Sequence, residues 1–358
     1  MKFSSLSLAL ALGLASTASI AAGAPAGKPE LGDFGVDLSA RDLSVKPGDD
    51  FNRYVSGAWL KSYQLKDYET SFGSFNALRD RSEAQVHGLI EELRNKGDLA
   101  PGSNDQKVRD FYASYMDRDA RDAKGIKPLQ PVLERIGSIK SKNDLISAFA
   151  NADLDASASP VRLGVDLDRK NPDQYLVSLN VGGLGLPDKD YYTNPDARFV
   201  KIREAYVAHI ARMLAFGGAK DAQARAQKVL ELETALAKPQ WERAKRRDRD
   251  KTYNVSSFAD LQKQFPSYDF AAHLKAQEMP QPDRVNVVTP DAVQPVLDVI
   301  AGTPLPVWRD YLAFHAVDGN AELLSREIDN ASFEFNGKVL AGQKAQKDDW
   351  KRAVAIVG

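Results

Sequence analysis

The chain has no cysteine, only four histidines and no excess of either charge. The absence of cysteine excludes disulfide frameworks, thiolate zinc sites, cysteine nucleophiles and lipid-anchored cysteines. Lys and Arg number 48 against 49 Asp and Glu, so the net charge does not favour nucleic acid or anionic lipid as a partner. With 358 residues, 43% of them hydrophobic, the chain can bury a sizeable core.

Apolar runs of membrane-spanning length are missing beyond the N-terminus. There, Lys2 precedes the run LSLALALGLASTASIAA, which ends in small residues before Pro25. A basic start, an apolar centre and a small-residue end are typical of a secretory signal peptide, here residues 1–24. A membrane anchor is the alternative, but the run is only marginally long enough to span a bilayer. We expect cleavage and export to the periplasm or outside of a bacterium, with no membrane span afterwards.

Helical spacing dominates after residue 50. Apolar residues recur at steps of three and four in five segments, residues 75–93, 108–115, 145–149, 199–214 and 229–236. Ser141 and Asp144 form a capping-box-like start for the third of these. Shorter helices are predicted at residues 257–264, 290–301, 305–316, 320–331 and 346–357.

One region alternates instead. Residues 161–167 and 175–181 place apolar side chains at every second position, and the turn-forming DRKNPD lies between them. This pattern predicts a β-hairpin. Its exit, VGGLGLPDKDYY, lacks the third glycine of a nucleotide fingerprint, and Asp188 and Asp190 flank its only lysine. Two carboxylates would repel a phosphate, so we interpret the exit as a structural corner.

Searches for catalytic motifs are negative. No two of the four histidines are spaced H-x-x-x-H, so no helix can offer two imidazoles to one zinc ion. We expect surface or core-edge histidines without a carboxylate partner; they are His87, His209, His273 and His315. There is no G-x-S-x-G elbow. The basic run over residues 241–251 is interrupted by aspartates, which favours a solvated or salt-bridged face over a nucleic-acid site.

Five segments carry a family resemblance, in family order from Pro47 to Val357. They are PGDDFNRYVSGAWLKSYQL, SFGSFNALRD, GLGLPDKDYY, ELETALAKPQWERAKRRDRDKTYN and FEFNGKVLAGQKAQKDDWKRAVAIV. Together they resemble the neprilysin and endothelin-converting-enzyme family of zinc metallopeptidases. The resemblance implies a mainly α, neprilysin-like helical fold, present in part, with the hairpin near residues 161–181.

The resemblance also implies a domain plan. After the signal peptide (residues 1–24) and a linker (25–46), residues 47–254 correspond to the N-terminal part of the catalytic domain. Residues 255–358 correspond to the start of an inserted helical domain. Both domains would be incomplete, and we expect helices with an uncovered apolar face, which promotes association.

The family's zinc motif, H-E-x-x-H with a later glutamate, does not occur in these 358 residues. The resemblance therefore implies the N-terminal portion of an exported zinc metalloendopeptidase for small peptides, inactive alone. Zinc belongs to the complete enzyme, and we expect none bound to this chain. Peptides would be its substrates once it is completed, for example by a separate chain carrying the zinc motif, and nucleic acid is not expected as a partner. The alternative is a non-catalytic peptide-binding or scaffolding protein derived from the same fold.

One substrate-binding residue carries over from the family. Arg79 matches the arginine of the F-x-x-L-R-D motif, which the resemblance places near a substrate's C-terminal carboxylate. Where some members have a second arginine, this chain has Ser71. The alternative for Arg79 is an ordinary ion pair with Asp80, Glu83 or Asp110 on the helix surface.

Overall fold

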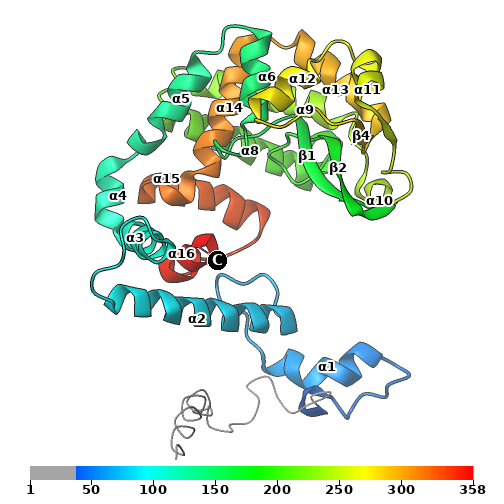
Figure 1. Cartoon of the computed structure of the whole chain (residues 1–358). Coiled ribbons are helices and arrows are strands. Elements are labelled where there is room, and N and C mark those ends of the chain that lie inside the picture. Colours follow the sequence, from blue (N-terminus) through cyan, green and yellow to red (C-terminus); the bar gives the residue numbers. More distant parts are fainter. Residues whose placement is uncertain (1–37, 358) are drawn as a thin grey trace, which may run out of the picture. The chain divides into compact units, whose positions relative to one another are not determined.

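The computed structural model describes residues 38–357, so the predicted signal peptide and most of the predicted linker lie outside it. The chain divides into two compact units, residues 1–65 and 66–358. The described part of the first unit holds η1 (Leu38–Ala40) and α1 (Phe51–Ser62). Figure 1 shows the elements of both units.

Asp42 ties the start of the first unit to α1. Its backbone N–H donates to the Tyr54 carbonyl at 2.9 Å, and its carboxylate lies 2.7 Å from Lys61 Nζ. Hydrogen bonds from Lys61 and Ser44 hold the pKa of the Asp42 carboxyl well below its usual range. The close fit requires Gly57, because an added Cβ there would lie 2.5 Å from the Asp42 Cβ.

The second unit is mainly helical. The five long helical segments predicted from the sequence are confirmed, and α6 begins with the predicted capping box of Ser141 and Asp144. The helices of this unit are α2 (Ser74–Asn95), α3 (Asn104–Met116), α4 (Arg118–Lys124), η2 (Lys127–Leu129), α5 (Gln130–Gly137), α6 (Lys142–Ala150), α7 (Asp190–Thr193), α8 (Ala197–Phe216), α9 (Ala222–Ala237), α10 (Arg243–Arg246), α11 (Phe258–Gln264), α12 (Phe270–Ala276), α13 (Pro290–Gly302), α14 (Leu305–Gly319), η3 (Ala321–Leu323), α15 (Arg326–Phe333), η4 (Glu334–Leu340, a π-helix) and α16 (Asp349–Val357).

The predicted hairpin is confirmed and belongs to a four-stranded sheet. β1 (Val161–Asp168) pairs antiparallel with β2 (Asn171–Val181), in a register that sets Leu163 opposite Leu179. The sequence analysis missed β3 (Val255–Ser257) and β4 (Arg284–Val287), which are too short to show a period. The order β1-β2-β4-β3 leaves β1 at an edge.

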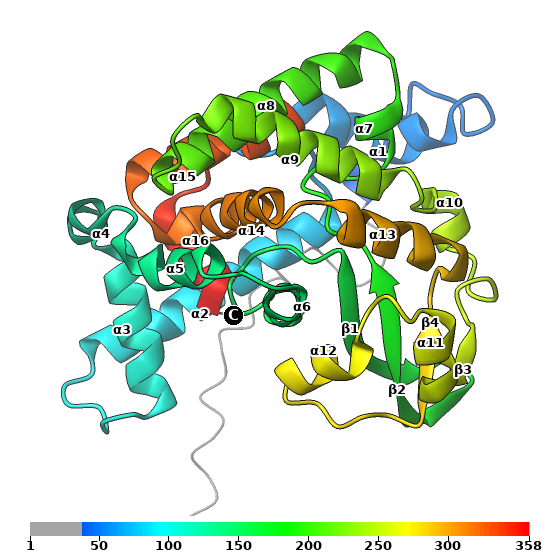
Figure 2. The ribbon, with the colours of Figure 1, turned by 90° about the horizontal axis from the view of Figure 1, so that it is seen from above.

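The main core of the second unit joins the sheet to most of the helices. Its buried apolar side chains run from Leu129 to Phe335. Figure 2 shows α8 and α9 side by side with α14 next to them, and these three helices contact one another. This core contains residues from both sides of the predicted boundary at 254, which stays a prediction.

A smaller core joins three helices far apart in sequence. Ile90 of α2, Tyr112 and Tyr115 of α3, and Ala353 and Val354 of α16 are buried together. The last helix is therefore packed against the first two of this unit.

The prediction of a single helix over residues 320–331 is wrong. The chain forms η3, turns extended at Leu324, and begins α15 at Arg326. The buried Arg121 guanidinium donates to the carbonyls of Glu322 and Leu324, which a continuous helix would use internally.

The long helix α2 has the predicted bounds, but much of its apolar stripe is uncovered. Phe75, Leu78 and Leu89 are 87%, 46% and 60% exposed. The face that packs carries Ile90 and, unexpectedly, the buried Glu83. The stripe and the packed face lie side by side around the helix. Ile90, with the partly buried Val86 next to it, packs in the small core with α3 and α16.

The exit from the hairpin is a corner, as interpreted. Gly183 has φ +79°, which favours glycine. An added Cβ at Gly185 would lie 1.9 Å from the Tyr206 hydroxyl. The Leu186 N–H donates to the Tyr192 hydroxyl at 2.8 Å. Backbone shape and buried tyrosines account for this sequence without a ligand.

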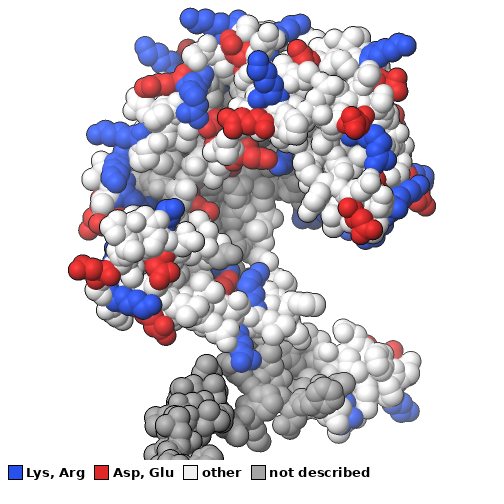
Figure 3. Space-filling view, viewed as in Figure 1, with Lys and Arg blue, Asp and Glu red and all other residues white. Residues whose placement is uncertain are grey.

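The surface carries both charge signs. The basic run of residues 241–251 is salt-bridged as predicted, with Arg243 paired to Asp188 at 2.8 Å and Lys245 to Asp291 at 3.2 Å. Figure 3 shows blue and red side chains interspersed over the second unit.

Within residues 38–357, no helix combines the length and apolar character needed to cross a bilayer.

Candidate functional site

Arg79 lies on the second turn of α2 with its side chain 56% exposed. Its Nε is 3.7 Å from Glu83 Oε1, the i,i+4 pair considered from the sequence. This contact is long and leaves most of the guanidinium accessible. Ser71 is also exposed, just before the helix. The Arg79 guanidinium can therefore pair with Glu83 and contact a ligand at the same time.

Glu83 is the buried centre of a charge cluster beside Arg79. Its carboxylate lies 3.3 Å from Lys347 Nζ and 3.4 Å from Lys351 Nζ. Lys351 Nζ also reaches Asp80 at 3.3 Å. Burial lowers the pKa of the Lys351 ammonium, but the hydrogen bond that it donates to Asp80 and the nearby carboxylates outweigh burial and raise the pKa. Lys351 therefore stays protonated, and Arg79 lies next to this cluster through its contact with Glu83.

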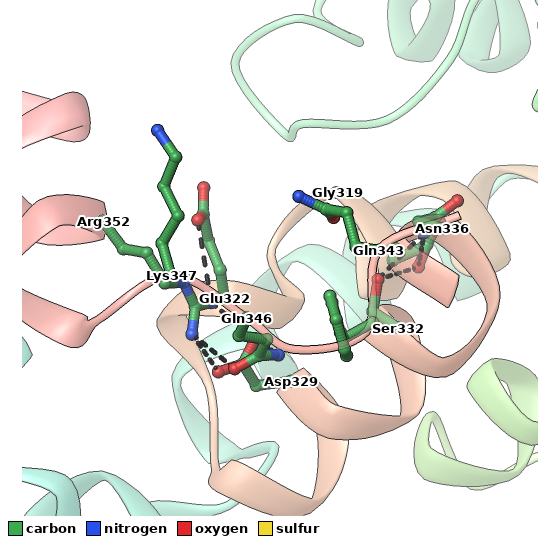
Figure 4. Close-up of a pocket in the computed structure, with 12 residues that line it drawn as sticks. Gly319, Glu322, Asp329, Ser332, Asn336, Gln343, Gln346, Lys347 and Arg352 are labelled. Atoms are coloured by element: carbon green, nitrogen blue, oxygen red, sulfur yellow. Dashed lines mark hydrogen bonds and ion pairs between the residues drawn. The ribbon is translucent and has the colours of Figure 1, made fainter. Parts of the chain in front are cut away.

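A polar cavity of about 370 Å³ adjoins this cluster through Lys347, which lines the cavity and pairs with Glu83. Figure 4 shows its side chains coming from α15, the π-helix η4 and the segment leading into α16. A π-helix is rare and frequently occurs at functional sites. The lining residues are Asp318, Gly319, Glu322, Asp329, Ser332, Phe333, Asn336, Gly337, Gln343, Gln346, Lys347 and Arg352.

One end of this cavity is a network of paired charges. Arg352 binds the Asp329 carboxylate with both guanidinium nitrogens, at 2.6 and 2.8 Å. Arg118 of α4 donates one hydrogen bond to Asp329 at 3.1 Å and another to Asp349 at 2.7 Å. These bonds hold α4, α15 and α16 together and leave no unpaired charge at this end.

The other end is organised by Asp318. Its carboxylate accepts hydrogen bonds from His209 at 3.0 Å, Ser332 at 2.7 Å and Asn336 at 3.1 Å. Burial raises the pKa of Asp318, but these donors outweigh burial and the pKa is lowered. Asp318 is thus an ionised acceptor that serves three donors, His209, Ser332 and Asn336.

The expectation that the histidines lack carboxylate partners is wrong for three of the four. His315 lies 2.8 Å from Glu233, His209 3.0 Å from Asp318, and His87 3.4 Å from Glu91. Two of these pairs could not be predicted from local sequence, because they join residues 82 and 109 positions apart. His273 meets Tyr268 instead.

These partners do not make a metal centre. Within residues 38–357, no three His, Cys, Asp or Glu side chains are grouped as a metal ion would require. The carboxylate neighbours also each serve other donors, since Glu233 accepts from two tyrosines and Asp318 from Ser332 and Asn336. The residues present do not fit a catalytic zinc ion, which needs three protein ligands and an open position.

The N-terminal model of peptidase family M13 matches residues 47–358. The chain belongs to peptidase family M13. This is the family of zinc metallopeptidases expected from the five sequence segments.

Solved structures agree with this assignment. The zinc metalloprotease ZMP1 of Mycobacterium tuberculosis is 31% identical, with a TM-score of 0.83 over 90% of this chain. PepO of Lactobacillus rhamnosis, 19% identical with a TM-score of 0.71, shares the fold. The mainly α, neprilysin-like fold predicted from the sequence is confirmed.

Curated M13 relatives are much longer than this chain. Mouse endothelin-converting enzyme-like 1 is 28% identical over 87% of this chain and 42% of its own length. Rat endothelin-converting enzyme 1 is 24% identical over 89% of this chain and 43% of its own length. The chain likewise covers 49% of ZMP1. It therefore spans less than half of the relatives it matches.

The sequence analysis selected Arg79 but missed the cavity beside it. The available signal was the M13-like segment over residues 333–357, which supplies more than half of the lining residues: Phe333, Asn336, Gly337, Gln343, Gln346, Lys347 and Arg352. Motif letters alone did not show that this segment folds against α2.

Proposed function

We propose that this chain is the N-terminal part of an exported zinc metalloendopeptidase that hydrolyses small peptides, and that it is inactive alone. The observation that carries the proposal is the match of residues 47–358 to a family whose named relatives are more than twice as long. The apolar N-terminal run supports export, to the bacterial periplasm or beyond. Under this proposal residues 47–254 and 255–358 belong to two domains, and both are completed by the missing half.

The exposed side of α2 supports a missing partner. Phe75, Leu78 and Leu89 lie on one stripe, and large apolar side chains so exposed on a structured helix are typical of a covered interface. We propose that the half carrying the zinc motif, in the same or in a separate chain, packs on this stripe. That half would supply the zinc ligands and the glutamate that accepts a proton from bound water.

This chain's own contribution to the complete enzyme is a scaffold and Arg79. The guanidinium is exposed and lies 3.7 Å from Glu83. It can bind a peptide's C-terminal carboxylate by a planar, two-pronged contact. Because Ser71 replaces a second arginine, we expect a modest preference for free C-termini.

Complementation tests the proposal. This chain, from residue 25 onward, is co-expressed with the zinc-motif half of ZMP1, and the native ZMP1 halves serve as the positive control. We expect chelator-sensitive hydrolysis of a fluorogenic peptide by the pair and none by this chain alone. Hydrolysis by this chain alone would contradict the proposal.

Arg79 is tested in the complemented enzyme. Arg79→Ala should raise KM several-fold for a peptide with a free C-terminus and leave KM for the matching C-terminal amide unchanged, since one charged hydrogen-bonded contact is lost. Arg94→Ala, on the same helix, is the control, because Arg94 pairs with Glu91. Equal KM changes for both peptides would assign Arg79 to the ion pair alone.

The alternative, a non-catalytic peptide-binding protein, is favoured by one observation. Another cavity is lined by His273 and Gln277, and each of these side chains has a buried polar atom without a hydrogen-bond partner among residues 38–357.

A further inference from the structure

We propose that the cavity between α6, α12 and the edge strand β1 binds one stretch of extended peptide backbone. This α12 cavity has a volume of about 520 Å³. Figure 2 shows α6 and α12 together beside β1, in agreement with the contacts between these elements. The lining residues used below are His273, Gln277, Leu163, Gly164, Arg162 and Asp153.

His273 supplies a hydrogen-bond donor to the cavity. Its side chain is 0% exposed, and Nδ1 lies 2.8 Å from the Tyr268 hydroxyl. If Nδ1 carried the proton, the buried tyrosine proton would have no acceptor, so we assign the proton to Nε2. Burial lowers the pKa of His273 to about 4, which keeps the ring neutral. Nε2 has no partner among residues 38–357.

Gln277 supplies an acceptor on the same side of α12. It follows His273 by four residues, and this spacing places both side chains on one helix face. The Gln277 Nε2 donates to the Leu163 carbonyl of β1 at 3.3 Å, which fixes the amide. Its Oε1 is buried and, within the described residues, has no donor. A buried polar atom without a partner has lost its hydrogen bond to water, so both atoms favour a ligand that pairs them.

An extended peptide matches this arrangement. Each residue of a strand points its N–H and its C=O to the same side, so one residue can donate to Gln277 and accept from His273. β1 lies at the sheet edge, where extended peptides commonly dock. The lining's charged side chains, Arg162 and Asp153, neutralise each other at 2.8 Å. An uncharged backbone is therefore favoured over an ion.

The choice of a peptide among amide-bearing ligands rests on the proposed peptidase function. The binding itself does not need zinc or the missing half. Failure of complementation would therefore leave this inference standing, and failure of peptide binding would leave the proposed enzyme standing.

Nitrogen-15 NMR of histidine-labelled chain tests the inference. Four histidines give four imidazoles, and a His273→Gln spectrum assigns one of them. The probe is the peptide acetyl-Ala-Ala-Val-Ala-Ala-amide. The matched control is an analogue, the same peptide with the valine nitrogen methylated. We expect the His273 Nε2 signal to shift on titration with the probe. The analogue should bind at least about fivefold more weakly, because it lacks the N–H that Gln277 accepts.

Two variants separate binding from folding. Gln277→Leu removes the acceptor, and Gly164→Val narrows the cavity at a position where an added Cβ meets no atom within 4 Å. Both should keep the thermal transition and weaken probe binding at least about fivefold, whereas Gln294→Leu on the exposed face of α13 should not. An unshifted His273 signal, or equal binding of probe and analogue, would overturn the inference.

Discussion

At the scale of single residues, buried polar groups in the second unit are fixed by long-range partners. Glu233 is 0% exposed, yet it accepts from Tyr192 at 2.6 Å and Tyr206 at 2.8 Å and lies 2.8 Å from His315. Tyr192 belongs to the corner after the hairpin, so this carboxylate connects the corner to α8, α9 and α14. Burial, with the charge of Glu233, raises the pKa of both tyrosines, which stay protonated donors.

Glu233→Leu should lower the free energy of unfolding by about 3 kcal/mol or more, because it leaves two buried hydroxyls and an imidazole without their acceptor. Chemical denaturation measures the change. Glu231→Leu is the matched control, since Glu231 is exposed on the same helix and should change stability by less than about 0.5 kcal/mol. Similar effects of the two substitutions would refute a structural role for the Glu233 cluster.

His273 gives a pH dependence with a definite sign. Burial lowers its pKa from 6.5 to about 4 in the folded chain. Between these values the unfolded chain binds a proton that the folded chain does not, so stability falls as the pH falls from about 6.5 to about 4. The loss should reach roughly 3 kcal/mol at the lower end and be absent above pH 7. Denaturation of His273→Gln should show a flatter profile over this range, and an unchanged profile would refute the assignment.

At the scale of elements, the sequence predicted the features that depend on residues close together in the chain. The capping box of Ser141 and Asp144 and the alternation of β1 and β2 involve near neighbours, and both were found. Their partners were not predictable, because β4 joins β2 in parallel only after about a hundred residues of chain. The break at Leu324 depends on Arg121, two hundred positions away, and no local pattern could show it. Arg79 was found because it belongs to a local motif. The cavity next to the Glu83 cluster was missed because its lining residues are far from α2 in the sequence.

The uncovered stripe of α2 yields a prediction of its own. Phe75→Ser with Leu89→Gln should change the free energy of unfolding by less than about 0.5 kcal/mol, because these side chains are 87% and 60% exposed. The same pair should reduce self-association of the isolated chain and weaken its pairing with a zinc-motif half. Analytical ultracentrifugation measures both. Ile90→Ser is the contrasting variant, since Ile90 is 2% exposed and its loss should destabilise the fold. A large loss of stability in the double variant would show that the stripe is already covered.

At the scale of the whole molecule, the M13 fold is present over residues 47–358 and the named relatives extend well beyond it. The five resembling segments, in order along the chain, were sufficient to predict the family and the mainly α fold. They could not give the substrate or the partner, since a fold positions a site without specifying its chemistry. The described residues contribute an ordered scaffold, an exposed arginine on α2, the polar cavity beside α15 and the α12 cavity.

The most direct test of the central claim is the zinc content of the isolated chain together with its peptide hydrolysis. After incubation with zinc and removal of the excess, mass spectrometry and calorimetry should find far less than one tightly bound ion per chain, and a fluorogenic peptide should remain intact. One tightly held zinc ion per chain with chelator-sensitive turnover would contradict the account.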